Sequence, residues 1–568
     1  MKPVRENRRP AALAGLGAAA LVLGCLSPWA TFPGFPGKMT LAGFPGGARL
    51  FCLALATGAA LVVVPVRGRR GAGLAAAAGA FVVVAVNVVA IAEEGGGLGT
   101  VAWGAWLSVA GACLLAAAFV GLPAERPTTS AGAVGHDREG EQAWPDVHRS
   151  TEAEAGGETP AEPGRPDRYV LGRSVELLAI AVTLVAVLAT VVWALAIDES
   201  SRFVSFAVMV AAAAVSLRHL GLFSWLGSVF GRHPRTATVL AAVTAAAFPF
   251  TQHGNAYWLR VFASIGVFAT AAIGLNVVVG LAGLLDLGYV AFFGVGAYVG
   301  AMFANASLTA VHIHLPFLLV VVMGGVVAAV FGLVIGTPTL RLRGDYLAIV
   351  TLGFGEIFRI TANNWDGLTR GPNGISGVPD LQVGSFNLGD THSVLGVALP
   401  GFANYYFVEL MLVGAAIVVF TRLNHSRIGR AWVAIREDEV AAAASGVDTV
   451  RLKLLAFAIG AFMAGAAGTV NAHVTTQVSP DSYTFVESIL LVAAVVLGGM
   501  GTVPGALLGS TVLFVIPEKL RSFQDKRLLL FGVALILMMR FRPEGIVAKD
   551  RRRRDSHVRA PRRATAIK

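Results

Sequence analysis

The sequence predicts an all-α fold: a polytopic helical membrane protein of about 16 spans, four followed by twelve, with both termini in the cytoplasm. Of the 568 residues, 55% are hydrophobic and only 14% are charged, whereas a soluble domain carries about 25% charged residues. Mean hydropathy is +0.69. The apolar residues form long blocks, and about 20 of them span the hydrocarbon core as a helix that satisfies its own backbone hydrogen bonds. The alternating strands of about 10 residues that a membrane β-barrel requires are missing from the pattern.

Four apolar segments open the chain, and their Ala, Gly and Val content is typical of closely packed membrane helices. They are expected near residues 11–29, 50–66, 71–92 and 101–121. Arginines cluster before the first segment and after the second, so the positive-inside rule places the N-terminus in the cytoplasm. We therefore expect residues 1–121 to form an accessory membrane module of about four helices.

Residues 122–174 have a different composition, rich in Glu, Gly, Pro, Thr and Arg and almost without large apolar side chains. Such a segment buries too little surface to fold. It is predicted to be a disordered cytoplasmic linker between two membrane parts.

Twelve further spans are expected in residues 175–548, which we interpret as the transport core. They lie near 175–196, 204–217, 236–250, 259–283, 284–304, 316–336, 345–363, 404–422, 455–475, 484–502, 503–518 and 527–541. This count places the loop 423–454 inside and the loop 364–403 outside, in agreement with their basic residues. Lys519 falls outside and violates the rule, so the segments near 484–518 could instead be re-entrant.

The basic C-terminal end and the three cysteines add little chemistry. Residues 542–568 hold ten Lys or Arg against three acidic residues. A basic tail after an apolar helix is typical of a cytoplasmic anchor at anionic headgroups rather than of nucleic-acid binding. We expect residues 549–568 to form this tail.

Cys25, Cys52 and Cys113 lie in apolar segments without metal-ligand spacing or a disulfide framework. Buried inert thiols are the simple interpretation, although Leu23-Gly24-Cys25 loosely matches a lipoprotein processing site.

Residues 259–362 carry the strongest signals for a transport path. Glycines follow Asn276 at high density, beginning with Gly280, and such density allows helices to pack closely or to break. Glu356 lies deep in an apolar segment, where a carboxylate costs about 3 kcal/mol, so it should face a bundle interior or a wet cavity. Arg359, three residues later, could form an ion pair with it that locks helices; the alternative is that Glu356 lines the path.

The residues around Glu356 complete this set of path or packing candidates. Gly353 and Gly355 suggest that the helix is interrupted just before Glu356, and Thr351 precedes them. Glu487 is a second acid in a predicted span. We find no pattern that predicts a catalytic residue or a metal site.

A helix signal in the cytoplasmic loop 423–454 indicates a docking element. Arg436 precedes the acidic run Glu437, Asp438 and Glu439, which suits a helix N-terminus, and an alanine run then leads to Gly446. A short helix of this kind could dock onto a soluble partner, and the alternative is a solvated charged loop.

Seven strings occur in an order and spacing that resemble LivM-type permeases of branched-chain amino acid ABC transporters. They are Gly274 through Gly280, Leu340 through Ile357, Gly371 through Ile375, Ala434 through Gly446, Ser479 through Ser482, Val496 through Gly501, and Arg542 through Gly545. They lie within about residues 236–547, and each string alone would be weak. In this chain Arg370 stands where the family has a glycine before Gly371.

The resemblance implies a function and a set of partners. The chain would be a transport subunit, not an enzyme, that moves branched-chain amino acids into the cytoplasm across a bacterial inner membrane. ATP and magnesium would be bound by two separate ATP-binding cassette subunits, which contact the Arg436–Gly446 segment. A second homologous permease and an extracytoplasmic binding protein would complete the assembly, the latter delivering substrate to the external loop that holds Gly371, Pro372, Asn373 and Gly374.

Two alternatives stay open from the residues. The same fold could import urea or another small amide. An ion-coupled secondary transporter would instead need intramembrane acids arranged for Na⁺ or H⁺, and Asp286, Glu356 and Glu487 are few for that purpose. No phosphate-binding loop occurs, because the one candidate, Gly34 through Met39, has Met39 where magnesium needs Ser or Thr.

Overall fold

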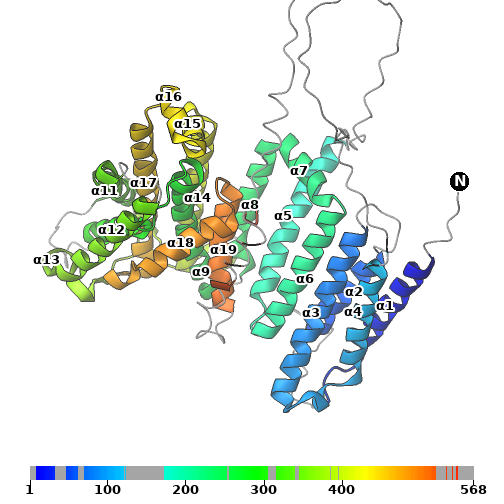
Figure 1. Cartoon of the computed structure of the whole chain (residues 1–568). Coiled ribbons are helices and arrows are strands. Elements are labelled where there is room, and N and C mark those ends of the chain that lie inside the picture. Colours follow the sequence, from blue (N-terminus) through cyan, green and yellow to red (C-terminus); the bar gives the residue numbers. More distant parts are fainter. Residues whose placement is uncertain are drawn as a thin grey trace, which may run out of the picture. The chain divides into compact units, whose positions relative to one another are not determined.

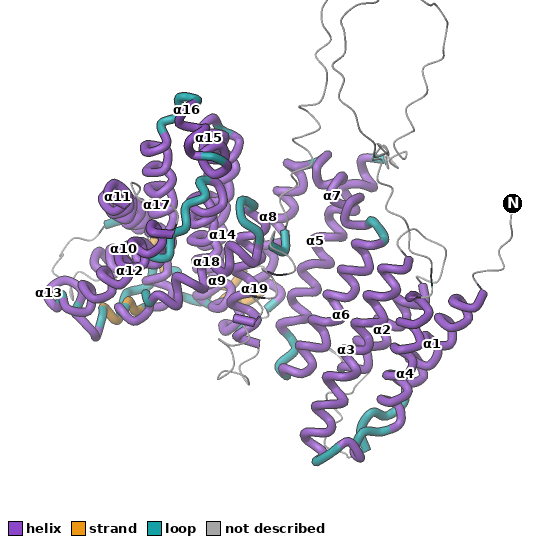
Figure 2. The backbone as a smooth tube through the Cα atoms, viewed as in Figure 1, coloured by secondary structure: helices purple, strands orange, loops and turns teal. Residues whose placement is uncertain are grey.

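The computed structural model describes residues 8–31, 47–61, 69–120, 122, 172–252, 255–304, 315–339, 345–383, 386–394 and 396–519, with 532–533, 536, 540 and 545–547. The predicted linker, apart from residues 122 and 172–174, lies outside this part, as do the basic tail and most of the last span. The described chain is helical almost throughout (Figures 1 and 2). It divides into two compact units: residues 1–197 with 201–241, and residues 198–200 with 242–568.

The first unit contains the four helices expected at the N-terminus and three that follow the linker. They are α1 (Arg8–Leu26), α2 (Ala48–Leu61), α3 (Arg69–Gly95), α4 (Trp103–Val120), α5 (Arg173–Leu195), α6 (Ser200–His219) and α7 (Leu222–Arg232), with a 3-10 turn η1 (Leu98–Thr100). The amphipathic α7 was not predicted. The boundary drawn by contacts therefore lies near residue 241, later than the change of composition at 174.

Small residues bring α1 and α4 together in the first unit. A Cβ on Gly17 would lie 2.7 Å from the Leu115 nitrogen, and one on Gly111 would lie 2.6 Å from the Leu21 nitrogen. The two backbones can approach this closely because neither glycine carries a side chain. Both helices stay continuous through the contact.

The second unit contains the predicted transport core. Its helices are α8 (Pro234–Thr251, which begins in the first unit), α9 (Ala256–Leu275), α10 (Tyr289–Ala304), α11 (Phe317–Thr339), α12 (Asp345–Asn364), α13 (Asp366–Thr369), α14 (Gly401–His425), α15 (Arg427–Glu437), α16 (Glu439–Ala444), α17 (Thr449–Thr475), α18 (Phe485–Gly498) and α19 (Val503–Lys519). Single turns accompany them: the π-helical η2 (Asn276–Leu281) and the 3-10 turns η3 (Gly371–Asn373) and η4 (Pro480–Ser482).

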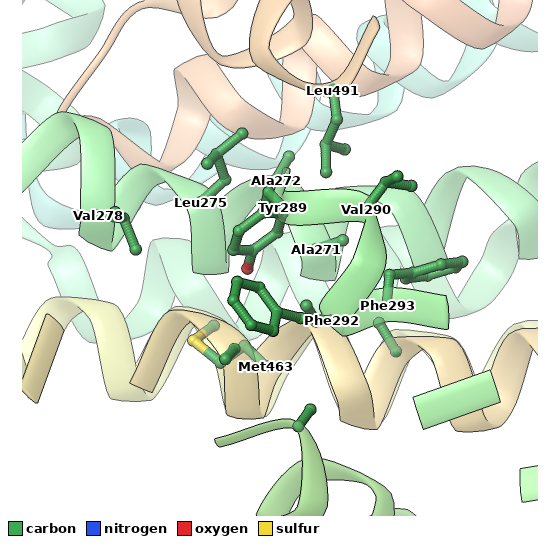
Figure 3. Packing of buried hydrophobic residues seen from close by; sticks show 14 of the residues in the cluster. Ala271, Ala272, Leu275, Val278, Tyr289, Val290, Phe292, Phe293, Met463 and Leu491 are labelled. Carbon is green, nitrogen blue, oxygen red and sulfur yellow. The ribbon is translucent and has the colours of Figure 1, made fainter. Parts of the chain in front are cut away.

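The core of this unit forms around α17, which packs on α9, α10 and α11. Figure 3 shows Tyr289 and Phe292 of α10 between Ala272 and Leu275 of α9 and Met463 of α17. The Tyr289 hydroxyl donates a 2.7 Å hydrogen bond to the Gly460 carbonyl. This bond lets the buried aromatic side chain satisfy its polar atom.

Six short strands lie outside the helices and were not predicted. They pair antiparallel as β1 (Ile375–Ser376) with β6 (Gln477–Val478), β2 (Gln382–Val383) with β3 (Phe386–Asn387), and β4 (His392–Val394) with β5 (Val397–Leu399). Five of them lie between α12 and α14, in the loop expected outside. They do not change the fold class.

Nine helices of the described residues are long and apolar enough to cross a membrane, and three shorter apolar helices accompany them. This confirms the all-α polytopic membrane fold, while the count of 16 spans and the sides of the termini stay predictions. Lys519, which violated the charge rule, ends α19 with a side chain that is largely buried. Its ammonium lies 4.4 Å from the Trp258 ring centroid, a cation–π contact that stabilises the charge there.

A candidate translocation path and its coupling loop

The α-helical geometry of α9 ends at Leu275, and residues 276–288, called the break below, connect it to α10. After Leu275 the helix continues as the π-helical turn η2, and an irregular stretch then leads to Tyr289. A π-helical turn inside a helix is often a functional site. The break predicted at Gly353 and Gly355 is wrong, because α12 runs without interruption from Asp345 to Asn364. The irregular backbone lies earlier in the chain instead, at η2 and the residues that follow it.

Asn276 holds this break against the loop between α18 and α19. Its side-chain nitrogen donates to the Thr502 carbonyl at 2.9 Å, and its side-chain oxygen accepts from the Gly501 nitrogen at 2.7 Å. Asn276 is fully buried. A Cβ on Gly280 would lie 2.0 Å from the Asn276 oxygen and 2.5 Å from the Gly501 nitrogen, so no larger residue fits. The predicted pair Asn276 and Gly280 thus joins two irregular segments.

Thr351 and Gly355 pack against the far side of the break. The Thr351 hydroxyl accepts from the Leu287 nitrogen at 3.1 Å. Gly288 lies so close to α12 that a Cβ there would overlap the Thr351 carbonyl, and Gly355 lies near Gly288. Gly355 therefore allows close packing rather than a helix end, whereas Gly353 has open space around it.

The expected ion pair of α12 is present. The Arg359 Nε donates to both Glu356 oxygens, at 3.0 and 3.1 Å, and Nη2 lies 2.5 Å from Oε1. Asp481 of η4 lies 3.8 Å from Arg359 Nη1. The Glu356 and Arg359 side chains are 43% and 29% exposed, so the described residues do not enclose Glu356 in a bundle interior, and the expected alternative, a wet cavity, stays a prediction. The pair lies on a part of α12 that the described residues leave partly open.

An aromatic cluster lies beside this ion pair. Phe358 is in edge contact with Tyr298 and Tyr483, whose ring centroids are 6.2 and 6.1 Å away. The Tyr298 hydroxyl is buried and has no hydrogen-bond partner among the described residues. The face around Glu356, Arg359 and Asp481 thus combines both charges with the neighbouring, half-buried Phe358, which packs on two buried tyrosines.

Glu487 lies in the first turn of α18, partly buried. A carboxylate is favoured there by the helix dipole. Its neighbour Ser488 accepts from the Val290 nitrogen at 3.2 Å, which joins α18 to the start of α10. The structure therefore places Glu487 near the α10 side of the core.

The segment predicted to couple to a partner consists of two helices rather than one. Asp438 separates α15 from α16, and its carboxylate caps α16 by accepting from the Val440 and Ala441 nitrogens, both at 2.9 Å. Glu437 accordingly ends α15 instead of starting a helix. The stop at Gly446 is confirmed, with φ +84° just after α16.

This segment is attached to the core through buried contacts. Arg436 reaches from α15 to the Gly280 carbonyl at 2.5 Å, and Trp432 donates to the Leu452 carbonyl at 2.7 Å. Glu439 forms a 2.6 Å ion pair with Lys453, whose side chain is 6% exposed. The outer side of α16 is exposed, with Val440 66% exposed. The loop therefore presents a small apolar surface while Arg436 touches the break in the core.

The residues predicted to form part of the external loop fold into a 3-10 turn beside a pair of strands. Pro372 and Asn373 complete the 3-10 turn η3 that starts at Gly371, and a Cβ on Gly374 would lie 2.2 Å from the Val478 carbonyl, beside the β1–β6 pair. Arg370 adopts φ +64°, a conformation that favours glycine. Its departure from the family pattern therefore falls on a strained position.

Glu409 of α14 was missed by the sequence analysis. It is 1% exposed, and neither carboxylate oxygen has a hydrogen-bond partner among the described residues. Gly266 of α9 faces it, since a Cβ there would lie 2.8 Å from the Glu409 Cβ. The signal that drew attention to Glu356, an acid inside an apolar block, was equally present here.

Apolar helices long enough to span a membrane, with a buried polar link between η2 and the α18–α19 loop, define a multi-pass membrane protein, and the comparisons with known proteins show that it is a transport permease. Residues 257–539 match the family model of the branched-chain amino acid transport system permease component. The chain is 40% identical over 327 residues to the high-affinity branched-chain amino acid transport system permease protein LivM of Escherichia coli, covering 55% of this chain and 75% of that protein. The chain belongs to this permease family.

Other relatives extend the picture. LivM of Salmonella typhimurium is 40% identical over 54% of this chain and 74% of its own length. The high-affinity branched-chain amino acid transport system permease protein LivH of Escherichia coli is 28% identical over 50% of this chain and 91% of its own length. No solved structure matches the chain. The family model begins within α9, and the residues that it matches lie in the second unit.

Proposed function

We propose that this chain is the translocation subunit of an ABC importer that moves branched-chain amino acids into the cytoplasm, with ATP hydrolysed by separate subunits. The observation that carries the proposal is the Arg436–Gly280 contact, which attaches a cytoplasmic docking loop to a broken helix in a chain of this family. The names of the relatives support the substrate class. The membrane would be the bacterial inner membrane.

The contacts suggest how a movement of α15 and α16 would reach the irregular segment between α9 and α10. Two ATPase subunits would bind the exposed side of α15 and α16 and would move these helices when ATP binds. Arg436 would carry that movement to the Gly280 carbonyl, and Asn276 would carry it onward to Gly501 and Thr502. Because irregular backbone moves at lower cost than an intact helix, the break is where access could alternate.

The part-exposed face of α12 supports a site for an amino acid. Arg359 could meet a substrate carboxylate, Glu356 or Asp481 could meet its ammonium, and the Phe358 cluster offers apolar surface for a branched side chain. A second homologous permease would cover this face and complete the path. An extracytoplasmic binding protein would release the amino acid at the loop with η3.

Reconstitution tests this proposal. The chain, a second permease, both ATPases and the binding protein, all from one source, would be placed in liposomes, and uptake of radiolabelled leucine and urea would be measured with and without ATP. We expect ATP-dependent leucine uptake and no urea uptake. Urea uptake alone would replace the substrate class, and uptake driven by an ion gradient without ATP would overturn the proposal.

A further inference from the structure

Two of the three cysteines meet in the first unit, although they are 27 positions apart in the sequence. Cys25 ends α1 and Cys52 lies in the first turns of α2, and both are fully buried in the same apolar cluster. The two side chains are neighbours, and the structure gives both as free cysteines. Cys113 of α4 is exposed and lies apart from this contact.

Arg49 fixes the same neighbourhood independently. Its Nε donates a 2.6 Å hydrogen bond to the Cys25 carbonyl. Arg49 and Cys52 are three residues apart on α2, so their side chains share one helix face. The arginine thereby brings the face of α2 that carries Cys52 against the end of α1.

The surroundings suit disulfide chemistry better than the other readings of these residues. Cys25 lies inside a continuous helix with no exposed surface, which does not fit a processed and lipidated cysteine. On the predicted topology this end of α1 and α2 faces the outside of the membrane, where disulfides form and persist.

We propose that Cys25 and Cys52 form a disulfide bond that links α1 to α2. An extracytoplasmic thiol oxidase with a reactive disulfide would supply the oxidant, before α1, α2 and α4 close over the two thiols. One cysteine thiolate attacks the oxidase disulfide to form a mixed disulfide, and the other then displaces the oxidase. Two S–H bonds are lost, one S–S bond forms, and the oxidase leaves as a dithiol that carries both electrons and both protons.

Counting thiols in the full-length protein tests the bond. Membranes would be lysed with N-ethylmaleimide present to block free thiols, the protein denatured, and half of it reduced before a maleimide–polyethylene glycol reagent is added. We expect no polymer adduct without reduction and two adducts after it, and peptide mass spectrometry should identify the Cys25–Cys52 link. Cells that lack the oxidase should give no adduct under either condition.

Matched variants keep the result unambiguous. Cys113→Ser should give the same counts as the natural sequence, whereas Cys25→Ser and Cys52→Ser should each give no adduct after reduction. A natural chain that gives no adduct after reduction would overturn the proposal. So would a link that joins Cys113, or two copies of the chain, instead of this pair.

Discussion

Glycines allow continuous helices to pack closely in the first unit, whereas in the second unit a glycine belongs to an irregular turn. In the first unit, Gly17 and Gly111 let α1 and α4 touch backbone to backbone while both helices remain continuous. In the second unit, Gly280 belongs to η2, where the helix changes to a π-helical turn and a polar network replaces regular packing. The difference teaches that small residues alone do not mark a path. In the second unit a buried polar side chain, Asn276, bridges the break as well, and this is the feature on which our path proposal depends.

The largest effect should come from filling the break. Gly280→Ala should abolish transport, because its Cβ would overlap the Asn276 amide oxygen and crowd the Gly501 nitrogen. Gly353→Ala on α12 is the matched control, since nothing lies within 4 Å of its Cβ, and should transport normally. Uptake and the amount of protein in the membrane would both be measured. Normal uptake by Gly280→Ala would remove η2 from the mechanism.

Removing the Arg436 contact to Gly280 should have the second largest effect on uptake. Arg436→Ala should lower ATP-dependent uptake about 10-fold or more, since hydrogen bonds to charged groups contribute about 1.5–3 kcal/mol. ATP hydrolysis should continue, because the ATPase sites are proposed to lie on other chains. Arg430→Ala on the same helix, whose side chain only reaches the exposed His425 carbonyl, is the control. Equal uptake by both variants would contradict a role for Arg436 in transmission.

A charge reversal in the docking helix tests the same segment from its outer side. Replacing Glu437 by Lys should abolish uptake while the protein still inserts, because its side chain is exposed; Asp438 should be kept, because its carboxylate caps α16. Glu439 should be left unchanged, since it pairs with the buried Lys453. Uptake would be compared with membrane abundance, and full uptake would mean that the ATPases bind elsewhere.

The ion pair of α12 should give a smaller and more selective effect. Glu356→Gln should assemble normally, because the pair is part-exposed in this chain and such pairs contribute little to stability. Uptake should fall if the pair lines the path, with no rescue by adding Arg359→Gln. Reduced assembly of the single variant, restored by the double variant, would instead assign the pair a purely structural role.

Removing the N-terminal helices should have the smallest effect of this series on transport. Deletion of residues 1–170 removes α1 to α4 but leaves every contact of η2 and α15 described above in place. We expect most of the uptake to remain when the partner subunits are present. Loss of uptake by a truncated chain that still inserts and assembles would make the module part of the path.

Much of the fold could be predicted because membrane helices follow from local composition. The four N-terminal helices and the core helices fall within a few residues of their predicted bounds, and the spacing of Glu356 and Arg359 predicted their ion pair. The errors share one cause. Gly353 and Gly355 suggested a break, yet whether a glycine ends a helix or only admits a neighbour depends on what packs against it, here Gly288.

By itself, then, the sequence determined the membrane class, the helix positions and the permease family, since these depend on apolar runs and on short strings of residues. The tertiary structure decided what those residues do. Asn276 acts on residues 225 and 226 positions away, and Arg436 on one 156 positions away. Which distant carbonyl or nitrogen a buried polar side chain meets is set by how the helices pack, and no local pattern encodes it.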